Sequence, residues 1–233
     1  NSINAAASMD HMVFMHTGLI AKANTPEGII GVLAHEVGHI AGGHLVHREG
    51  HVRKSSLLAL ASIALGAAAI VAGSPDAGAG IMHGGMQSAT GVFLHYGRGQ
   101  EASADQAALK YLKELGWSAK GLQDFLKLLS KQELMSASRQ DSYLLTHPLS
   151  SERVQLISRY VKESPDTNKR LPDSFYEKFD RMIAKVKAYM EPPMGVLMKY
   201  KANDPSPAAQ YARAIAYYRD KKFPQSLAIL QDL

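Results

Sequence analysis

Apolar residues recur with helical spacing along most of the chain, so the predicted elements are mostly helices. The clearest helix follows Thr25, a residue type that caps helix N-termini, and has Pro26 at its first position. Its apolar side chains continue to Ile40, and Gly42-Gly43 is the predicted end. Further helices are predicted at residues 100–115, 119–132, 151–161, 173–190 and, as a pair joined near Lys221-Lys222, within 208–233.

Four segments depart from the helical pattern. Residues 11–16 (HMVFMH) are partly rich in β-forming residues and predict a short exposed strand followed by a turn. Residues 74–85 are rich in glycine and predict a loop, whereas residues 133–149 predict a polar loop before a helix capped by Ser150. Residues 164–172 contain two prolines between helical patterns and predict a linker.

One long stretch is unusually apolar. Between Ser55 and Gly97 the sequence has a single formal charge, Asp76. Residues 57–73 (LLALASIALGAAAIVAG) are apolar enough for a membrane span, but at 17 residues they lie at the short limit of what crosses a bilayer.

Composition narrows the classes of function. With 233 residues, 46% of them hydrophobic, the chain is long enough to bury a core without crosslinks. The absence of cysteine excludes disulfide scaffolds, thiol nucleophiles and thiolate-bound metals. The formal net charge is +5, but the basic residues are scattered and not interleaved with aromatic residues. We therefore expect no nucleic-acid partner.

The candidate chemistry lies in the first predicted helix, as His35-Glu36-Val37-Gly38-His39. Residues four apart on a helix share a face, so both imidazoles can reach one metal ion. Zinc lowers the pKa of a coordinated water towards about 7, and a carboxylate beside that water acts as its general base. The HExxH pattern therefore predicts one zinc ion held by His35 and His39, with Glu36 as the base.

Two histidines need a third ligand, and the sequence offers several. His44 nearly completes an HExxHxxGxxH pattern, but the required position is 45, where Leu45 stands. Glu101 lies on a later predicted helix, one turn before Asp105. One of these carboxylates can bind zinc while the other accepts a hydrogen bond from a ligand imidazole, and we favour Glu101 over His44. The remaining candidates are His47, His51 and His83.

Three segments together resemble a known family. GVLAHEVGHIAGGH, EASAD and THPLSSER are similar to gluzincin metallopeptidase family 48, which includes HtpX, the CAAX prenyl endopeptidase and a soluble, BepA-like periplasmic subgroup. The resemblance covers about residues 1–160. It implies a mainly α-helical zincin-type fold with a small β element and an exposed strand at 11–16 that pairs with substrate. It also implies that His35, His39 and Glu101 are the zinc ligands and that Glu36 is the general base. Asp105 would then contact a ligand without binding the metal itself.

The resemblance also places the His147-Pro148 segment near the metal. Pro148 restricts His147 to an extended conformation, so its ring is presented from a loop. His147 either donates a hydrogen bond to the developing oxyanion or takes the fourth zinc position and holds the enzyme inactive, and we favour the second role. Arg153, one turn into the next helix, is expected to neighbour either the substrate or Glu101.

Integral-membrane members of that family carry spans between HExxH and the third ligand. A single span at 57–73 would place Glu101 across the bilayer from His35, and the partner segment 81–96 contains His83, Gln87 and His95. The prediction is therefore a soluble protein, in which residues 57–73 are buried or rest on a membrane surface or partner.

The C-terminal segment YARAIAYYRDKKFPQSLAIL resembles the start of a tetratricopeptide repeat. The expected organisation is a peptidase domain at 1–163, a linker at 164–172 and the start of a repeat region at 173–233, in a chain that is part of a longer protein. The resemblance implies a periplasmic endopeptidase for unfolded or misassembled proteins, with outer-membrane assembly proteins as partners of the repeats. The alternative is a chaperone-like adaptor with latent proteolysis.

Overall fold

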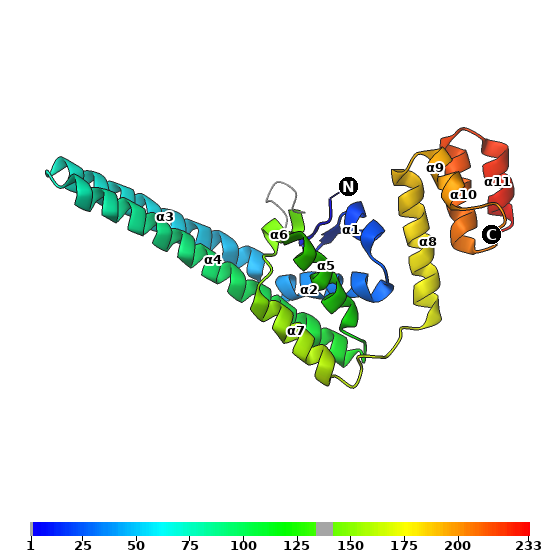
Figure 1. The fold of residues 1–233 in the computed structure, drawn as a ribbon, viewed down its shortest axis with the longest axis horizontal. Helices are drawn as coiled ribbons and strands as arrows, with labels where there is room; N and C mark the ends of the chain where they lie inside the picture. Colours follow the sequence, from blue (N-terminus) through cyan, green and yellow to red (C-terminus); the bar gives the residue numbers. More distant parts are fainter. Residues whose placement is uncertain (1, 134–141) are drawn as a thin grey trace.

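The computed structural model describes residues 2–133 and 142–233 and confirms a mainly helical protein with one small sheet (Figure 1). The elements are β1 (Ala5–Ala7), β2 (Val13–Met15), α1 (Thr17–Lys22), α2 (Pro26–Ala41), α3 (His44–Val71), α4 (Pro75–Glu114), α5 (Lys120–Glu133), α6 (Ser142–Thr146), α7 (Ser151–Glu163), α8 (Asp173–Met190), α9 (Pro193–Lys199), α10 (Pro207–Arg219) and α11 (Phe223–Gln231).

The sheet is an antiparallel pair in which Ala6 lies opposite Phe14. The predicted strand at 11–16 forms as the exposed β2, but a helix, α1, follows it in place of the predicted turn. Its partner β1 was missed, because a run of alanines carries little β-propensity. β1 forms because Ile3 and Ala5 are fully buried and hold the segment against the core.

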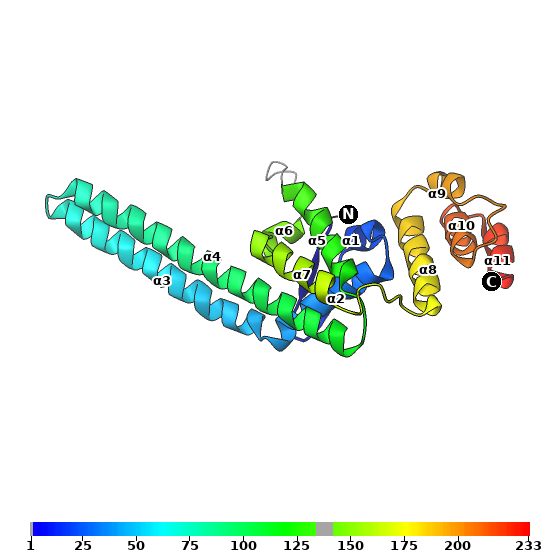
Figure 2. The same cartoon turned by 60° about the horizontal axis from the view of Figure 1, so that its bottom comes forward.

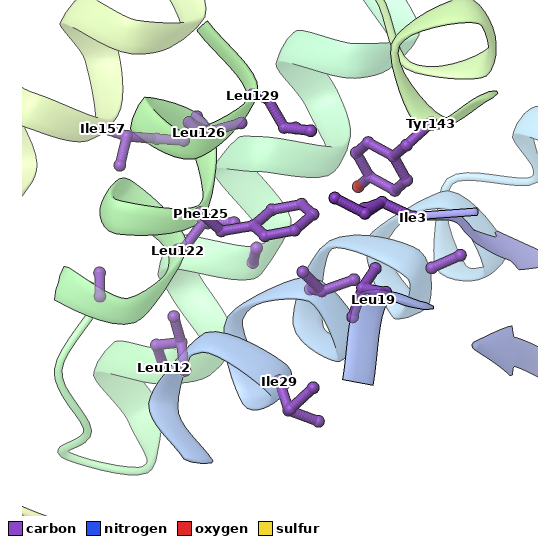
Figure 3. Packing of buried hydrophobic residues seen from close by; sticks show 14 of the residues in the cluster. Ile3, Leu19, Ile29, Leu112, Leu122, Phe125, Leu126, Leu129, Tyr143 and Ile157 are labelled. Atoms are coloured by element: carbon purple, nitrogen blue, oxygen red, sulfur yellow. The ribbon is translucent and has the colours of Figure 1, made fainter. Parts of the chain in front are cut away.

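The main core packs around α2, with the second half of α4 and α5 against it (Figure 3). Val32 from α2, Leu112 from α4 and Leu122 and Leu129 from α5 are almost completely buried. Gly38 permits the close approach of α2 to α4, because a Cβ there would lie 2.7 Å from the carbonyl oxygen of Ala104. This contact brings the HExxH helix against the segment that carries Glu101.

Helices α3 and α4 form a long antiparallel hairpin that projects from this core (Figures 1 and 2). The structure corrects one prediction here and narrows another. The glycine-rich residues 74–85 are not a loop, since α4 begins at Pro75 and runs without interruption to Glu114. Of the two environments predicted for residues 57–73, burial in protein is wrong, since only 11% of the most apolar 18-residue window of α3 is buried, and contact with a membrane surface or partner stays a prediction.

The C-terminal helices gather around a second cluster that includes Ala188 from α8, Val196 from α9 and Ala212 from α10. The predicted helix at 173–190 and the helix pair at the C-terminal end are present, whereas α9 was missed. Helix α8 belongs to both clusters, because its Phe179 and Ile183 pack into the main core. It therefore joins the C-terminal helices to the main core.

Candidate metal centre

Helix α2 presents both histidines of the motif to the interior. Its N-terminus is capped as the sequence predicts, with Thr25 Oγ1 accepting a hydrogen bond from the Gly28 amide. His35 and His39, one turn apart, turn their Nε2 atoms towards each other at 3.1 Å. Both imidazoles are buried, so each needs a polar partner or an ion at this nitrogen.

Glu101 from α4 and His147, which follows α6, complete a group of four donors. The carboxylate of Glu101 lies 3.3 Å from His35 Nε2 and 3.2 Å from His39 Nε2. The Nδ1 atom of His147 lies 3.4 Å from His35 Nε2 and 3.2 Å from Glu101 Oε1. The ligand atoms of all four buried residues lie within 4.8 Å of one another.

These separations fit one tetrahedral metal ion. Zinc bonds of 2.0–2.1 Å to nitrogen and oxygen in tetrahedral geometry place neighbouring ligand atoms about 3.3 Å apart. The measured separations of 3.1 to 3.4 Å between neighbouring donors match this spacing. Three imidazoles and one carboxylate also form a donor set that suits zinc. The residues present therefore fit a zinc ion.

A buried ion-pair network holds two of the donors in place. His35 Nδ1 lies 2.9 Å from Asp105 Oδ1. The guanidinium of Arg153 donates two hydrogen bonds to the carboxylate of Asp105, at 2.7 and 2.9 Å. Its Nη1 atom also lies 2.8 Å from Glu101 Oε2. Of the two neighbours predicted for Arg153, the structure provides Glu101. The guanidinium also donates to the Pro148 carbonyl oxygen at 3.0 Å, which ties the His147 segment to the same network.

The network sets the charges of the site. Burial acts to raise the pKa of Glu101, but hydrogen bonds from His147, His35 and His39 outweigh it and hold that pKa far below the usual value. Burial acts to lower the pKa of His35, but its contacts with Asp105 and Glu101 prevail and raise it to about 9. A metal ion at His35 Nε2 competes with this proton, so metal binding is expected to weaken as pH falls.

His44 contacts the metal-binding candidate His39 and is not one of the four donor residues. Its Nδ1 atom is 3.0 Å from Nδ1 of His39, so it can orient that ring and leave Nε2 for the metal. Burial lowers the pKa of both His39 and His44, which favours the neutral imidazole that metals bind. The other candidates lie elsewhere: His47 and His51 line a neighbouring hollow, and His83 contacts Gln87 on the hairpin.

Glu36 lies beside the donors but outside their set. It is fully buried, and its Oε2 atom has no hydrogen-bond partner among the described residues. Its Oε1 atom lies 3.5 Å from both His147 Nε2 and the hydroxyl of Tyr143. A buried carboxylate oxygen without a partner needs one from outside the protein, such as a water or a substrate group.

Sequence reasoning missed Tyr143. Its ring is almost completely buried, stacks on His147 with centroids 4.4 Å apart and points its hydroxyl at Glu36. Burial, and then the neighbouring Glu36, raise the pKa of Tyr143 well above its usual value, so the hydroxyl stays a donor. A lone tyrosine in a polar segment carries no signal in a single sequence that would reveal this role.

The site opens into a pocket of about 280 Å³. Glu36, His39 and His147 lie in its wall, as do Ala6 and Ala7 of β1. The strand that borders the cleft is therefore β1. None of residues 11–16 lines this pocket, so the prediction that they form the strand beside the cleft is wrong.

An HExxH helix, a glutamate from a later helix and a buried carboxylate beside the donors define a zincin-type metallopeptidase domain. Residues 1–161 match Peptidase family M48, and the chain belongs to this family. The family assignment made from the three sequence segments is thus confirmed.

Similar proteins occur among curated bacterial proteases. The chain is 25% identical over 239 residues to the putative beta-barrel assembly-enhancing protease of Vibrio cholerae, covering 100% of this chain and 48% of the relative. It is 25% identical over 236 residues to the beta-barrel assembly-enhancing protease of Escherichia coli K12, with the same coverage. It is 32% identical over 161 residues to the metalloprotease LoiP of that strain, covering 66% of this chain and 57% of LoiP. The chain thus spans about half the length of the first two relatives.

Proposed function

We propose that this chain carries the catalytic centre of a zinc-dependent endopeptidase that hydrolyses peptide bonds in unfolded or misassembled proteins. The observation that carries the proposal is the set of four buried donors, His35, His39, Glu101 and His147, with the unpartnered oxygen of Glu36 beside it. Family membership and the protease relatives support the same activity.

Glu36 is the proposed general base. When bound, a zinc ion supplies a water of lowered pKa and polarises the scissile carbonyl. Glu36 Oε2 takes a proton from the attacking water and delivers it to the nitrogen of the leaving amine. Tyr143 approaches Oε1 of the same carboxylate, so it orients Glu36 and leaves Oε2 for this transfer. Arg153 and Asp105 keep the ring of His35 fixed during the reaction.

The edge of β1 is the proposed docking site for the substrate backbone. The His16 amide donates to Asn4 and the Ser8 amide to Met12, so the even-numbered residues of β1 face β2. Ala5 and Ala7 then turn their backbone groups to the opposite edge, which no described strand pairs. On that edge the Ile3 carbonyl accepts from the Tyr143 amide, so the edge faces the site. A substrate that added to this edge as a strand would be recognised through its backbone, so substrates of many sequences could bind.

For His147 we propose the fourth metal position. Its Nδ1 atom lies at 3.2 to 3.4 Å from the donor atoms of Glu101 and His35, which is the spacing of ligands to one ion. A protein nitrogen at this position excludes the water that Glu36 must deprotonate. The enzyme in this arrangement is therefore inactive until His147 withdraws, and oxyanion stabilisation by His147 is the competing role.

We also propose a bacterial periplasmic location and one zinc ion per chain. The relatives named for beta-barrel assembly suggest partners among outer-membrane assembly proteins, bound through a tetratricopeptide-like region at 173–233. An apolar hollow lined by Tyr218 of α10 and by Phe223, Leu227 and Leu230 of α11 supports a further packing partner there. The adaptor function would use this same region. We further propose that residues 57–73 contact a membrane.

Incubation of the full-length protein with unfolded casein tests the activity. We expect cleavage that a chelator abolishes and added zinc restores. Casein cleavage that persists at full rate in the chelated, zinc-free protein would contradict the proposal. Casein that binds to the zinc-loaded protein without being cut, even after prolonged incubation, would favour the adaptor function.

A further inference from the structure

Large apolar side chains are exposed along both helices of the α3–α4 hairpin. Leu60 and Leu65 on α3 are 62% and 64% exposed, and Val71 near the tip is 89% exposed. Ile81 and Val92 continue the exposed apolar surface on α4. Within the described chain, α3 is a helix long and apolar enough to cross a membrane by length and composition. In water, an exposed apolar surface of this extent is unfavourable unless something covers it.

The seam between the two helices has the opposite composition. The buried positions are small residues, Ser62 and Gly66 on α3 and Gly78 and Ala89 on α4. The half-buried Gly85 lies against Ser62, and the half-buried Met82 lies against Gly66. A Cβ at Gly66 would lie 2.6 Å from the Gly78 carbonyl oxygen, so the backbones touch. Helix pairs in water place large apolar residues in the seam, whereas helix pairs in lipid place small residues there. The hairpin follows the lipid pattern.

Several polar side chains on the hairpin form hydrogen bonds within their own helix. The hydroxyl groups of Ser62, Ser88 and Thr90 each donate to a backbone carbonyl oxygen one turn earlier, at 2.8 to 2.9 Å. His83 and Gln87, also one turn apart, bond to each other at 2.9 Å. A hydrocarbon environment requires internal partners of this kind, because it offers no water to hydrogen-bond.

Charges mark the two ends of the apolar part. Exposed Arg53 and Lys54 precede it on α3, and exposed Arg98 follows it on α4. Because His51 stacks on Tyr96, with centroids 3.4 Å apart, these basic residues lie within about one helical turn of each other along the hairpin. The 17 residues of 55–71 rise about 25 Å, close to the ~30 Å of bilayer hydrocarbon, which leaves Asp76 near the far headgroups.

We propose that residues 55–97 insert into a lipid bilayer as a helical hairpin, with Arg53, Lys54 and Arg98 at anionic headgroups. The hairpin enters and leaves on one side, so Glu101 stays on the side of His35 and His39. This removes the objection that applies to a single span at 57–73. Insertion also places the catalytic pocket at the membrane surface, because Leu45, Leu94 and Gln100 line it from the base of the hairpin.

The inference rests on the membrane contact in the proposed function and not on the proteolysis, so each is measured separately. The chain has no cysteine, which permits single-cysteine labelling of the full-length protein with an environment-sensitive fluorophore. Leu65→Cys reports the hairpin, and Lys110→Cys, at an exposed position of α4 outside the hairpin, is the matched control. Vesicles of phosphatidylethanolamine and phosphatidylglycerol are the probe.

We expect the label at position 65 to shift to the blue with vesicles and to be quenched by lipids carrying a quencher on the acyl chain, and the label at 110 to do neither. A label at 65 that already emits in the blue without vesicles would show that protein covers the hairpin, which overturns the inference. A label at 65 that vesicles leave unchanged also overturns it. Casein cleavage by the same variants without vesicles reports the peptidase activity independently.

A charge substitution gives a second test. An arginine at the centre of a spanning helix is strongly unfavourable, so Leu65→Arg should weaken vesicle partitioning on the order of 100-fold. Leu115→Arg, at a similarly exposed leucine outside the hairpin, should not change it. Each substitution of Arg53, Lys54 or Arg98 by glutamine should weaken binding to anionic vesicles about five-fold and leave binding to neutral vesicles unchanged. Equal partitioning of the two arginine variants would contradict insertion.

Discussion

The two ends of α4 follow opposite patterns of burial. In its second half the buried positions include the charged Glu101 and Asp105, and the exposed positions include Lys110 and Glu114. In its first half the buried positions are small, as at Gly78 and Ala89, and the large apolar residues face outward.

The difference shows that one continuous helix can be built for two surroundings. The second half buries its charges because each has a partner of opposite charge or a hydrogen-bond donor, as Asp105 has in Arg153. The first half buries almost no side-chain volume and depends on close backbone contact with α3. The metal centre therefore depends on polar pairing, and the hairpin depends on small residues. Substitutions can test each separately.

The largest expected effect is at the general base. Glu36→Gln keeps the shape of the side chain but cannot accept a proton, so casein cleavage should fall about 10²- to 10⁴-fold while zinc content is unchanged. Rates at fixed zinc occupancy measure this, and Glu114→Gln on the exposed end of α4 serves as control. A zinc-loaded Glu36→Gln protein that retains most of its activity would show that the base lies elsewhere.

The hairpin should respond to volume added at its seam. Gly66→Leu forces the helices apart, at a cost of about 1–3 kcal/mol, whereas Ala67→Leu places the same side chain on the exposed surface. Hydrogen exchange of amides in 57–92 should therefore be about 5- to 150-fold faster in Gly66→Leu alone. Exchange within α2 should be the same in both variants. Equal protection of the hairpin in the two would mean that the seam is not closely packed.

The ion-pair network should respond to the loss of a planar guanidinium. Arg153→Lys keeps the charge but cannot hold Asp105 and Glu101 together, so zinc affinity should fall about 10- to 100-fold. Competition with a chromogenic chelator measures this affinity. Arg159→Lys, an exposed position on the same helix α7, should leave it unchanged. Identical affinities for the two variants would remove the positioning role of Arg153.

A smaller effect is expected at His147. If its imidazole occupies the fourth metal position, His147→Ala should keep zinc and raise basal casein cleavage several-fold, because water gains that position. His83→Ala, a histidine of the hairpin, should have no effect on cleavage without membranes. A fall in cleavage with His147→Ala, at unchanged zinc content, would instead support oxyanion stabilisation.

Much of the metal centre could be predicted from the sequence, because its parts are local. Thr25 and Pro26 mark the start of α2, and the four-residue spacings of His35 with His39 and of Glu101 with Asp105 each define one helix face. What brings those two faces together is not local. It depends on Gly38, whose missing side chain admits α4, and on Tyr143, which reaches Glu36 from a distant segment.

The hairpin and β1 show why the remaining elements were missed. Glycine has a low helix propensity, so the glycine-rich sequence of residues 74–85 led to the prediction of a loop. In the structure Gly78 stays helical because its lack of a side chain lets α3 pack against it. β1 was missed for the opposite reason, since alanines favour helix but Ile3 and Ala5 are held in the core. In both places tertiary contact overrides local preference.

Zinc content after dialysis, measured by atomic absorption in Glu101→Ala and His44→Ala, tests the central claim most directly. Glu101 contributes an oxygen to the group of donors, whereas His44 only contacts the far nitrogen of His39. We predict that zinc content after dialysis falls in Glu101→Ala, which lacks the one carboxylate donor, and stays at one ion per chain in His44→Ala. A Glu101→Ala protein that keeps its zinc while His44→Ala loses it would contradict the metal centre described above.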